Sequence, residues 1–205
     1  MTEDGSLPPR ERILTAVLHL LDEGGTDAVS TRAVGSAADV QAPAIYRLFG
    51  DKQGLLEAAV ERGYADWVAR KGDRPLPADP VDALRTGWDE AIEFGVEHPA
   101  MYRIGVGRTT RSPALSAGHG LLLEKIQRVA AAGRLRVDEE QALALVQAAA
   151  RGVTLAVLDD PATSPSTRSL STMAREAVIA AIVTCLLYTS PSPRDRTRSR
   201  MPSSA

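Results

Sequence analysis

The side chains of this chain that could do chemistry gather in one short stretch, residues 30–52. Hydroxyl-bearing and cationic groups stand there close together: Thr31, Arg32, Arg47 and Lys52, with the phenol of Tyr46 among them. Cations and hydroxyls bind phosphate oxygens, and Thr31 and Lys52 also stand near expected helix starts, where backbone amides favour anions. These residue types indicate binding to a nucleic-acid backbone; the alternative is that they are ordinary solvated side chains.

Two short helices joined by a tight turn must position these side chains. Ser30 can cap the first helix, because its hydroxyl can accept a hydrogen bond from an amide of the first turn. Asp39 stands where the chain must reverse, and aspartate tolerates a left-handed backbone better than most residues. Pro43 suits the first turn of a second helix over residues 42–49. These proportions predict a helix-turn-helix.

The segment resembles the DNA-binding region of the TetR family of bacterial transcriptional regulators, over about residues 10–61. The shared motif has an apolar residue in the turn, here Val40, a helical tyrosine, Tyr46, then Phe49 and a capped lysine, Lys52. By this resemblance the second helix faces the DNA groove, with Ala42 and Pro43 able to touch a thymine methyl group. The resemblance gives this candidate DNA-contact set: Thr31, Arg32, Ala42, Pro43, Ala44, Tyr46, Arg47 and Lys52.

Two residues depart from the family pattern. Gly35 stands where alanine is usual, which should loosen the first short helix by roughly 0.5–1 kcal/mol. Asp39 stands where glycine is usual, and its negative charge close to DNA should weaken binding modestly.

The rest of the pattern predicts an all-α fold. Apolar residues recur at helical spacing over residues 10–23, which should back the two short helices, and over residues 52–71, long enough to leave the small domain. A Pro-rich connector follows at residues 72–80. Beyond it we expect helices at 81–97, 99–104, 114–132, 138–158 and 170–184, with loops at 105–113 and 159–169.

About nine helices result, arranged as an N-terminal three-helix helix-turn-helix domain plus a C-terminal helical ligand-binding and dimerisation domain. The expected divisions are 1–71, which includes most of the connecting fourth helix, 72–184 and 185–205. The second part also resembles TetR-family C-terminal domains with a His-Pro-Ala-x-Tyr segment, here His98 to Tyr102.

The last division, Cys185 to Ala205, changes abruptly to Ser, Pro and Arg. DNA that could encode residues 185–195 and 199–205 resembles sequencing-adapter sequence, so we interpret this division as a non-native, disordered tail. The alternative is a genuine disordered basic tail. Without it the chain has 20 basic and 25 acidic residues, from totals of 24 and 26 less four Arg and one Asp, a net charge of −5. A net negative charge is compatible with DNA binding, because only the binding face must be positive.

Composition narrows the class of protein. Apolar residues make up 44% of the 205, enough for a core, and no run of about 18 apolar residues predicts a membrane span. The acidic N-terminus lacks the apolar segment of a secretory signal, so we expect a cytoplasmic protein. The three histidines are scattered, and no phosphate loop or nucleophile motif is present, so we expect neither a metal site nor a cofactor.

Two further surfaces are expected in the C-terminal domain. Small and apolar residues between 142 and 157 suit close helix approach in a homodimer, although the same pattern fits an ordinary buried helix. A cavity among the helices should bind a small-molecule effector. The candidate lining residues, each of which could instead be plain core, are Trp88, Phe94, Met101, Tyr102, Gln147 and Arg151.

We therefore expect a homodimeric regulator that binds a double-stranded DNA operator and is released from it by a ligand, most simply a repressor. An activator or architectural DNA binder of the same fold is the first alternative. An all-helical enzyme or ligand carrier is the second, and it would need a cluster of titratable residues that the sequence does not offer.

Overall fold

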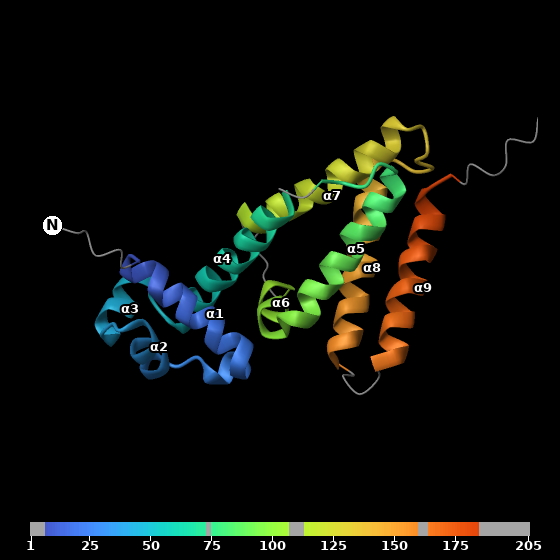
Figure 1. Cartoon of the computed structure of the whole chain (residues 1–205). Coiled ribbons are helices and arrows are strands. Elements are labelled where there is room, and N and C mark those ends of the chain that lie inside the picture. The colour runs from blue at the N-terminus through green and yellow to red at the C-terminus, as the bar shows by residue number, and fades with distance from the viewer. Residues whose placement is uncertain (1–6, 73–74, 107–112, 160–163, 185–205) are drawn as a thin grey trace, which may run out of the picture.

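The computed structural model describes residues 7–72, 75–106, 113–159 and 164–184. Within these ranges the chain is helical, with no strand (Figure 1). The helices are α1 (Pro9–Ala28), α2 (Thr31–Ala38), α3 (Ala42–Phe49), α4 (Lys52–Gly72), α5 (Pro80–Glu97), α6 (Pro99–Val106), α7 (Pro113–Ala131), α8 (Glu139–Asp159) and α9 (Ser164–Ile182). The all-α expectation is confirmed.

The small N-terminal unit has its own core. Helices α1, α2 and α3 and the first half of α4 enclose fully buried aliphatic side chains, including Ile13, Val17, Val34 and Leu55. The regular part of α1 ends where predicted, because Gly24 and Gly25 take non-helical backbone angles inside it. Since α2 and α3 have only eight residues each, packing against α1 and α4 must hold them in place.

The larger unit is a bundle of α5, α7, α8 and α9 (Figure 1). Its core contains Trp88, Ile126 and Ile182, with valines from α8 and α9. The end of α9 is tied to the α7–α8 connection, because the Thr184 amide donates to the Arg134 carbonyl at 2.7 Å. The bundle thus closes through backbone hydrogen bonds as well as apolar packing.

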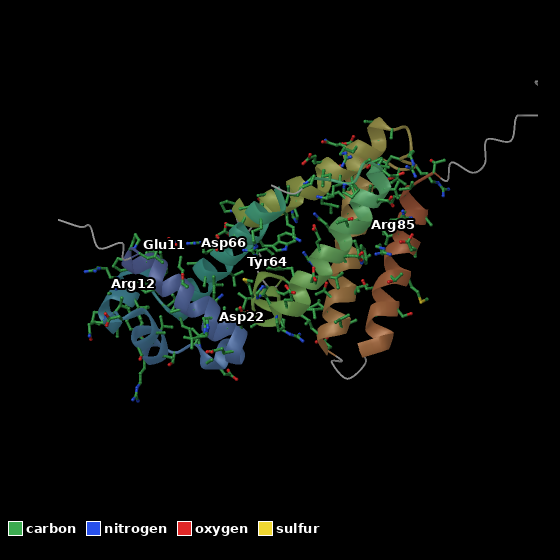
Figure 2. All side chains as sticks on the ribbon, viewed as in Figure 1. Glu11, Arg12, Asp22, Tyr64, Asp66 and Arg85 are labelled. Atoms are coloured by element: carbon green, nitrogen blue, oxygen red, sulfur yellow. The ribbon has the colours of Figure 1, made fainter. Side chains whose placement is uncertain are left out.

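Helices α4 and α6 join the two units. With 21 residues, α4 reaches from the helix-turn-helix into the bundle over about 30 Å. Helix α6 packs against α4 at two glycines: a Cβ at Gly63 would lie 2.3 Å from Met101 Sδ, and one at Gly105 would lie 2.9 Å from the Tyr64 ring. Figure 2 shows Tyr64 at this junction. The small residues let the two helices approach closely.

Helix α9 begins earlier in the chain than the sequence predicts. The loop over residues 159–169 is wrong at its end, because α9 begins at Ser164 rather than Leu170. A proline in the first helical turn is compatible with a helix start, so Pro165 does not prevent a helix from beginning at Ser164. Residues 107–112, 160–163 and the expected tail at 185–205 lie outside the described residues.

Candidate DNA-binding surface and ligand cavity

The turn of the helix-turn-helix has the backbone that its sequence predicts. The Ser30 hydroxyl accepts a hydrogen bond from the Ala33 amide at 3.1 Å and caps α2. Asp39 ends α2 in the left-handed region, with φ 51° and ψ 56°. Arg12 of α1 donates to the carbonyl oxygens of Ala38 at 3.0 Å and Asp39 at 3.2 Å. Figure 2 labels this arginine on α1. The turn is therefore fixed both locally and from the helix behind it.

Helix α3 has one buried face and one exposed face. Ile45 is 3% exposed and anchors the helix to the core, whereas Tyr46 is 53% exposed. Ala42, Pro43 and Arg47 are also exposed, and Ala44 is half-buried. The phenol oxygen of Tyr46 lies 3.3 Å from Thr31 Oγ1 at the start of α2, so the two helices offer polar groups side by side. A solvent-facing helix anchored in this way has the form of a recognition helix.

Lys52 stands at the first position of α4, and Asp51 caps that helix by accepting from the Gly54 amide at 2.8 Å. The ammonium group donates to the Thr26 carbonyl at 3.0 Å, across the end of α1. This contact orients the lysine at a helix N-terminus, where an anion is also favoured. Arg32, in the first turn of α2, is exposed.

A cavity of about 410 Å³ lies in the C-terminal part, among α4, α5, α6, α7 and α8. Aromatic side chains line it, including Tyr64 and Trp67 from α4 and Trp88 from α5. Burial raises the pKa of Tyr64 above its usual value, so its phenol stays protonated. Phe94 packs beneath the aromatic wall, with its ring centroid 4.9 Å from that of Tyr64 and 5.1 Å from that of Trp67. The volume is within the range of small-molecule sites.

The cavity also has charged and polar lining groups. Lys71 and Glu90 form an ion pair at 2.9 Å. Lys125 is 8% exposed, and its ammonium donates to the Leu121 carbonyl of its own helix at 3.3 Å. Burial lowers the pKa of Lys125, with smaller opposing effects from nearby carboxylates. A largely apolar cavity with a few such groups can both hold and orient a ligand.

Residues 13–59 match the sequence model described as bacterial regulatory proteins, tetR family. Over these residues the chain is similar to TetR-family regulators. It is 37% identical over 76 residues to the HTH-type transcriptional repressor KstR of Rhodococcus jostii (strain RHA1), an alignment that covers 37% of this chain and 35% of that protein. The chain therefore aligns with about a third of the length of this relative.

Solved structures extend the likeness over both units. A possible TetR family transcriptional regulator from Streptomyces coelicolor A3(2) matches with a TM-score of 0.65 at 22% identity, covering 84% of this chain and 98% of that one. FadR from Bacillus subtilis, in complex with stearoyl-CoA, matches with a TM-score of 0.67 at 14% identity, covering 84% and 98%. At these identities the likeness shows a shared fold: an N-terminal helix-turn-helix followed by a helical C-terminal domain.

The structure brings together some of the predicted ligand-binding side chains and separates others. Of the ligand candidates, Trp88, Tyr102, Gln147 and Arg151 line the cavity. Phe94 and Met101 do not line it, and instead form a small core with Val60. Sequence reasoning missed several lining residues, among them Tyr64, Trp67, Lys71, Glu90 and Lys125.

The DNA candidates all lie on α2, on α3 and at the start of α4, next to one another in the fold. One neighbouring cation was missed: the Arg10 guanidinium lies 5.7 Å from the centroid of the Phe49 ring, at the end of α3. Its only signal in the sequence is its place at the beginning of the first helix.

Proposed function

We propose that this chain is a cytoplasmic, homodimeric transcriptional repressor that binds a double-stranded DNA operator and is released by a small-molecule effector. The observation that carries the proposal is the exposed face of α3, where Tyr46 stands 53% exposed beside Thr31 while Ile45 anchors the helix. Resemblance to KstR, a transcriptional repressor, favours a repressor over an activator.

The proposed DNA contacts divide by chemistry. Ala42, Pro43 and Tyr46 face the major groove, where apolar groups can touch thymine methyls and a phenol can reach a base or a phosphate. Thr31, Arg32, Arg47 and Lys52 contact the phosphate backbone and position the helix. Ala44, which is half-buried, supports α3 at the edge of this surface.

A dimer is proposed because one helix-turn-helix makes a small interface. The outward faces of α8 and α9 suit that contact: Leu145 is 42% exposed and Met173 is 68% exposed, with Ala144, Ala148 and Gly152 exposed beside them. The sequence-based surface was too broad, because Ala142, Val146, Val153 and Val157 are buried in the chain's own core. Helix α8 is apolar and long enough to cross a membrane, but its apolar residues divide between this core and this face.

The proposed release mechanism runs through α6 and α4. Tyr102, Gly105 and Val106 of α6 line the cavity, whereas Ala100 and Ile104 of the same helix pack on the helix-turn-helix core. At the start of α6, His98 Nδ1 lies 2.9 Å from Asp22 Oδ1 of α1. Figure 2 labels Asp22 toward the end of α1.

Helix α4 carries both Lys52 and three lining residues, Tyr64, Trp67 and Lys71. A ligand that displaces α6 or α4 would thereby change the spacing of the two recognition helices in the dimer. An effector favours the released form only as far as it binds that form more tightly.

The proposal is tested by fluorescence anisotropy with duplexes that tile the DNA upstream of the chain's own gene. We expect one duplex to bind in a salt-dependent way, and Tyr46→Ala to weaken that binding about tenfold or more, which corresponds to about 1.4 kcal/mol. Lys52→Ala should lower the salt slope by about 1 for each lysine that contacts phosphate. Arg136→Ala, an exposed cation after α7, is the control and should bind normally. Normal binding by folded Tyr46→Ala and Lys52→Ala proteins would remove the basis of the proposed surface.

A further inference from the structure

The charges in the cavity are unbalanced. Its lining has three cationic side chains, Lys71, Lys125 and Arg151, and one carboxylate, Glu90. Glu90 forms an ion pair with Lys71 at 2.9 Å, and both side chains are more than four-fifths buried. Lys125 forms no ion pair in the described part of the chain, and Glu90 and Glu124 act on its ammonium only from a longer distance. A buried ammonium without a counter-ion is costly, and an anion supplied from outside would offset that cost.

The place of Lys125 depends on a glycine in the facing helix. A Cβ at Gly87 of α5 would lie 3.1 Å from both Cδ and Cε of Lys125. The stem of the lysine thus runs closely along α5, and the missing side chain at position 87 leaves room for it. Glycine inside a helix costs about 0.5–1 kcal/mol relative to alanine, so this room is obtained at the expense of helix stability.

A second buried donor faces the same cavity from α8. Gln147 lines it, and its Nε2 is buried with no hydrogen-bond partner among the described residues. A buried amide N–H without a partner needs an acceptor, which a ligand oxygen can provide. The carboxylate of Glu61 also has a buried oxygen without a partner, Oε2, but Glu61 is outside the lining and its other oxygen accepts from the Ala114 amide at 2.7 Å. The two lining groups are thus donors that call for an acceptor.

The remaining walls suit a flat or apolar body. Trp67, Trp88 and Tyr102 give aromatic faces to the cavity. The Trp88 Nε1–H donates to Ser171 Oγ at 3.0 Å, so this polar atom is already satisfied and the ring acts as an apolar wall. Aromatic walls accept both aromatic and aliphatic ligand groups.

We infer that the cavity binds an amphipathic acid, with an aromatic or other apolar body against Trp67, Trp88 and Tyr102, and an anionic head on Lys125 with Gln147 donating to it. The inference rests on the proposed function, because it names the chemical class of the effector. The lining charges count against a cationic ligand, which would meet the ammonium of Lys125, and a neutral ligand would leave that ammonium without a counter-ion.

The test uses two fluorescent probes that differ in one group. The first is 1-anilinonaphthalene-8-sulfonate, which is anionic, and the second is N-phenyl-1-naphthylamine, its neutral parent. Each is titrated into the full-length protein with excitation through the tryptophans. The chain has two tryptophans, Trp67 and Trp88, and both line the cavity. We expect the anionic probe to bind at least about tenfold more tightly than the neutral one.

Lys125→Met keeps the length of the side chain and removes its charge. It should weaken the anionic probe about tenfold and leave the neutral probe within about twofold, and Gln147→Leu should weaken the anionic probe by a smaller factor. Arg136→Gln removes a cation outside the cavity and is the matched control, with no expected change for either probe. Gly87→Ala, which crowds the lysine without removing it, should also reduce the preference for the anionic probe.

Equal binding of the two probes by the unaltered protein, or an effect of Lys125→Met that is the same for both, would overturn the inference. The comparison of probes in the unaltered protein needs no variant, so it holds even where a variant does not fold. Neither probe measurement involves DNA. Failure of the inference is therefore distinct from failure of DNA binding, which the Tyr46→Ala titration measures separately.

Discussion

Asp39 is the residue at which backbone strain and DNA affinity can be separated by substitution. It is the one non-glycine residue with positive φ in the described part of the chain, at φ 51° and ψ 56°. Arg12 contacts the carbonyl oxygens of residues 38 and 39 rather than the carboxylate, so a change of side chain leaves that support in place. Asp39→Gly therefore acts on the backbone preference and on one exposed charge.

The two effects differ in size. A left-handed backbone destabilises the folded state by about 1–2 kcal/mol for an L-residue, and by less for aspartate. Glycine removes this strain, but its greater freedom in the unfolded chain lowers the free energy of unfolding by about 0.5–1 kcal/mol. Asp39→Gly should thus stabilise the fold by about 0.5–1 kcal/mol and raise Tm by about 1–4 °C. A carboxylate roughly 10 Å from a phosphate in water contributes about 0.4 kcal/mol before salt screening, so its removal should tighten DNA binding by about twofold or less.

The assays are thermal unfolding and fluorescence anisotropy with a bound duplex. Asp39→Asn removes the charge and keeps a side chain that tolerates this backbone, so it should tighten DNA binding as glycine does without the gain in Tm. Asp39→Ala, which lacks that tolerance, should lower Tm. A loss of stability in Asp39→Gly, or weaker DNA binding in Asp39→Asn, would refute the account of this turn.

Three further predictions concern packing and assembly. Gly35→Ala should lower the free energy of unfolding in urea by about 1 kcal/mol, because the new Cβ would lie 2.9 Å from the Val40 carbonyl oxygen. Alanine has the better helix propensity, so a gain in stability would contradict this steric argument. Met173→Glu should convert the dimer to monomer in sedimentation, whereas Leu76→Glu, in the connector, should not; a dimeric Met173→Glu protein would exclude the proposed face. Lys125→Met should stabilise the protein at neutral pH by about 1 kcal/mol, as measured by chemical unfolding, because it removes a buried charge. Burial lowers the pKa of Lys125 below its ordinary 10.5. Between the lowered pKa and 10.5 the unfolded chain therefore binds more protons than the folded protein, and the folded protein should become more stable as pH rises through that window. The Lys125→Met variant should not show this gain.

The parts of the fold that local chemistry determines could be predicted. The Ser30 cap, the left-handed Asp39 and the start of α4 each depend on residues within one helical turn. The effect of Gly35 could not be predicted in the same way. From the sequence, a glycine at position 35 indicates only a weaker helix. The close approach of Gly35 to the Val40 carbonyl depends on how the turn folds back.

The lining of the cavity was harder still to predict from the sequence, because it depends on how distant helices pack. Trp88 and Tyr102 were predicted as bulky residues of the right domain, but Phe94, six residues further along α5, packs into a small core instead. Lys125 could not be predicted, since a lysine on an amphipathic helix usually faces solvent. Its burial follows from the relative rotation of α5 and α7 and from the glycine opposite it. Five helices must be placed before such a residue becomes a candidate.

Selection of binding sites from a random duplex pool can show whether two copies of the exposed α3 face read DNA together. The full-length protein should enrich an inverted repeat whose two half-sites lie about one helical turn, roughly 10 base pairs, apart, and Tyr46→Ala should fail to enrich it. Enrichment of the same repeat by Tyr46→Ala, or of an unpaired half-site by the unaltered protein, would contradict the account.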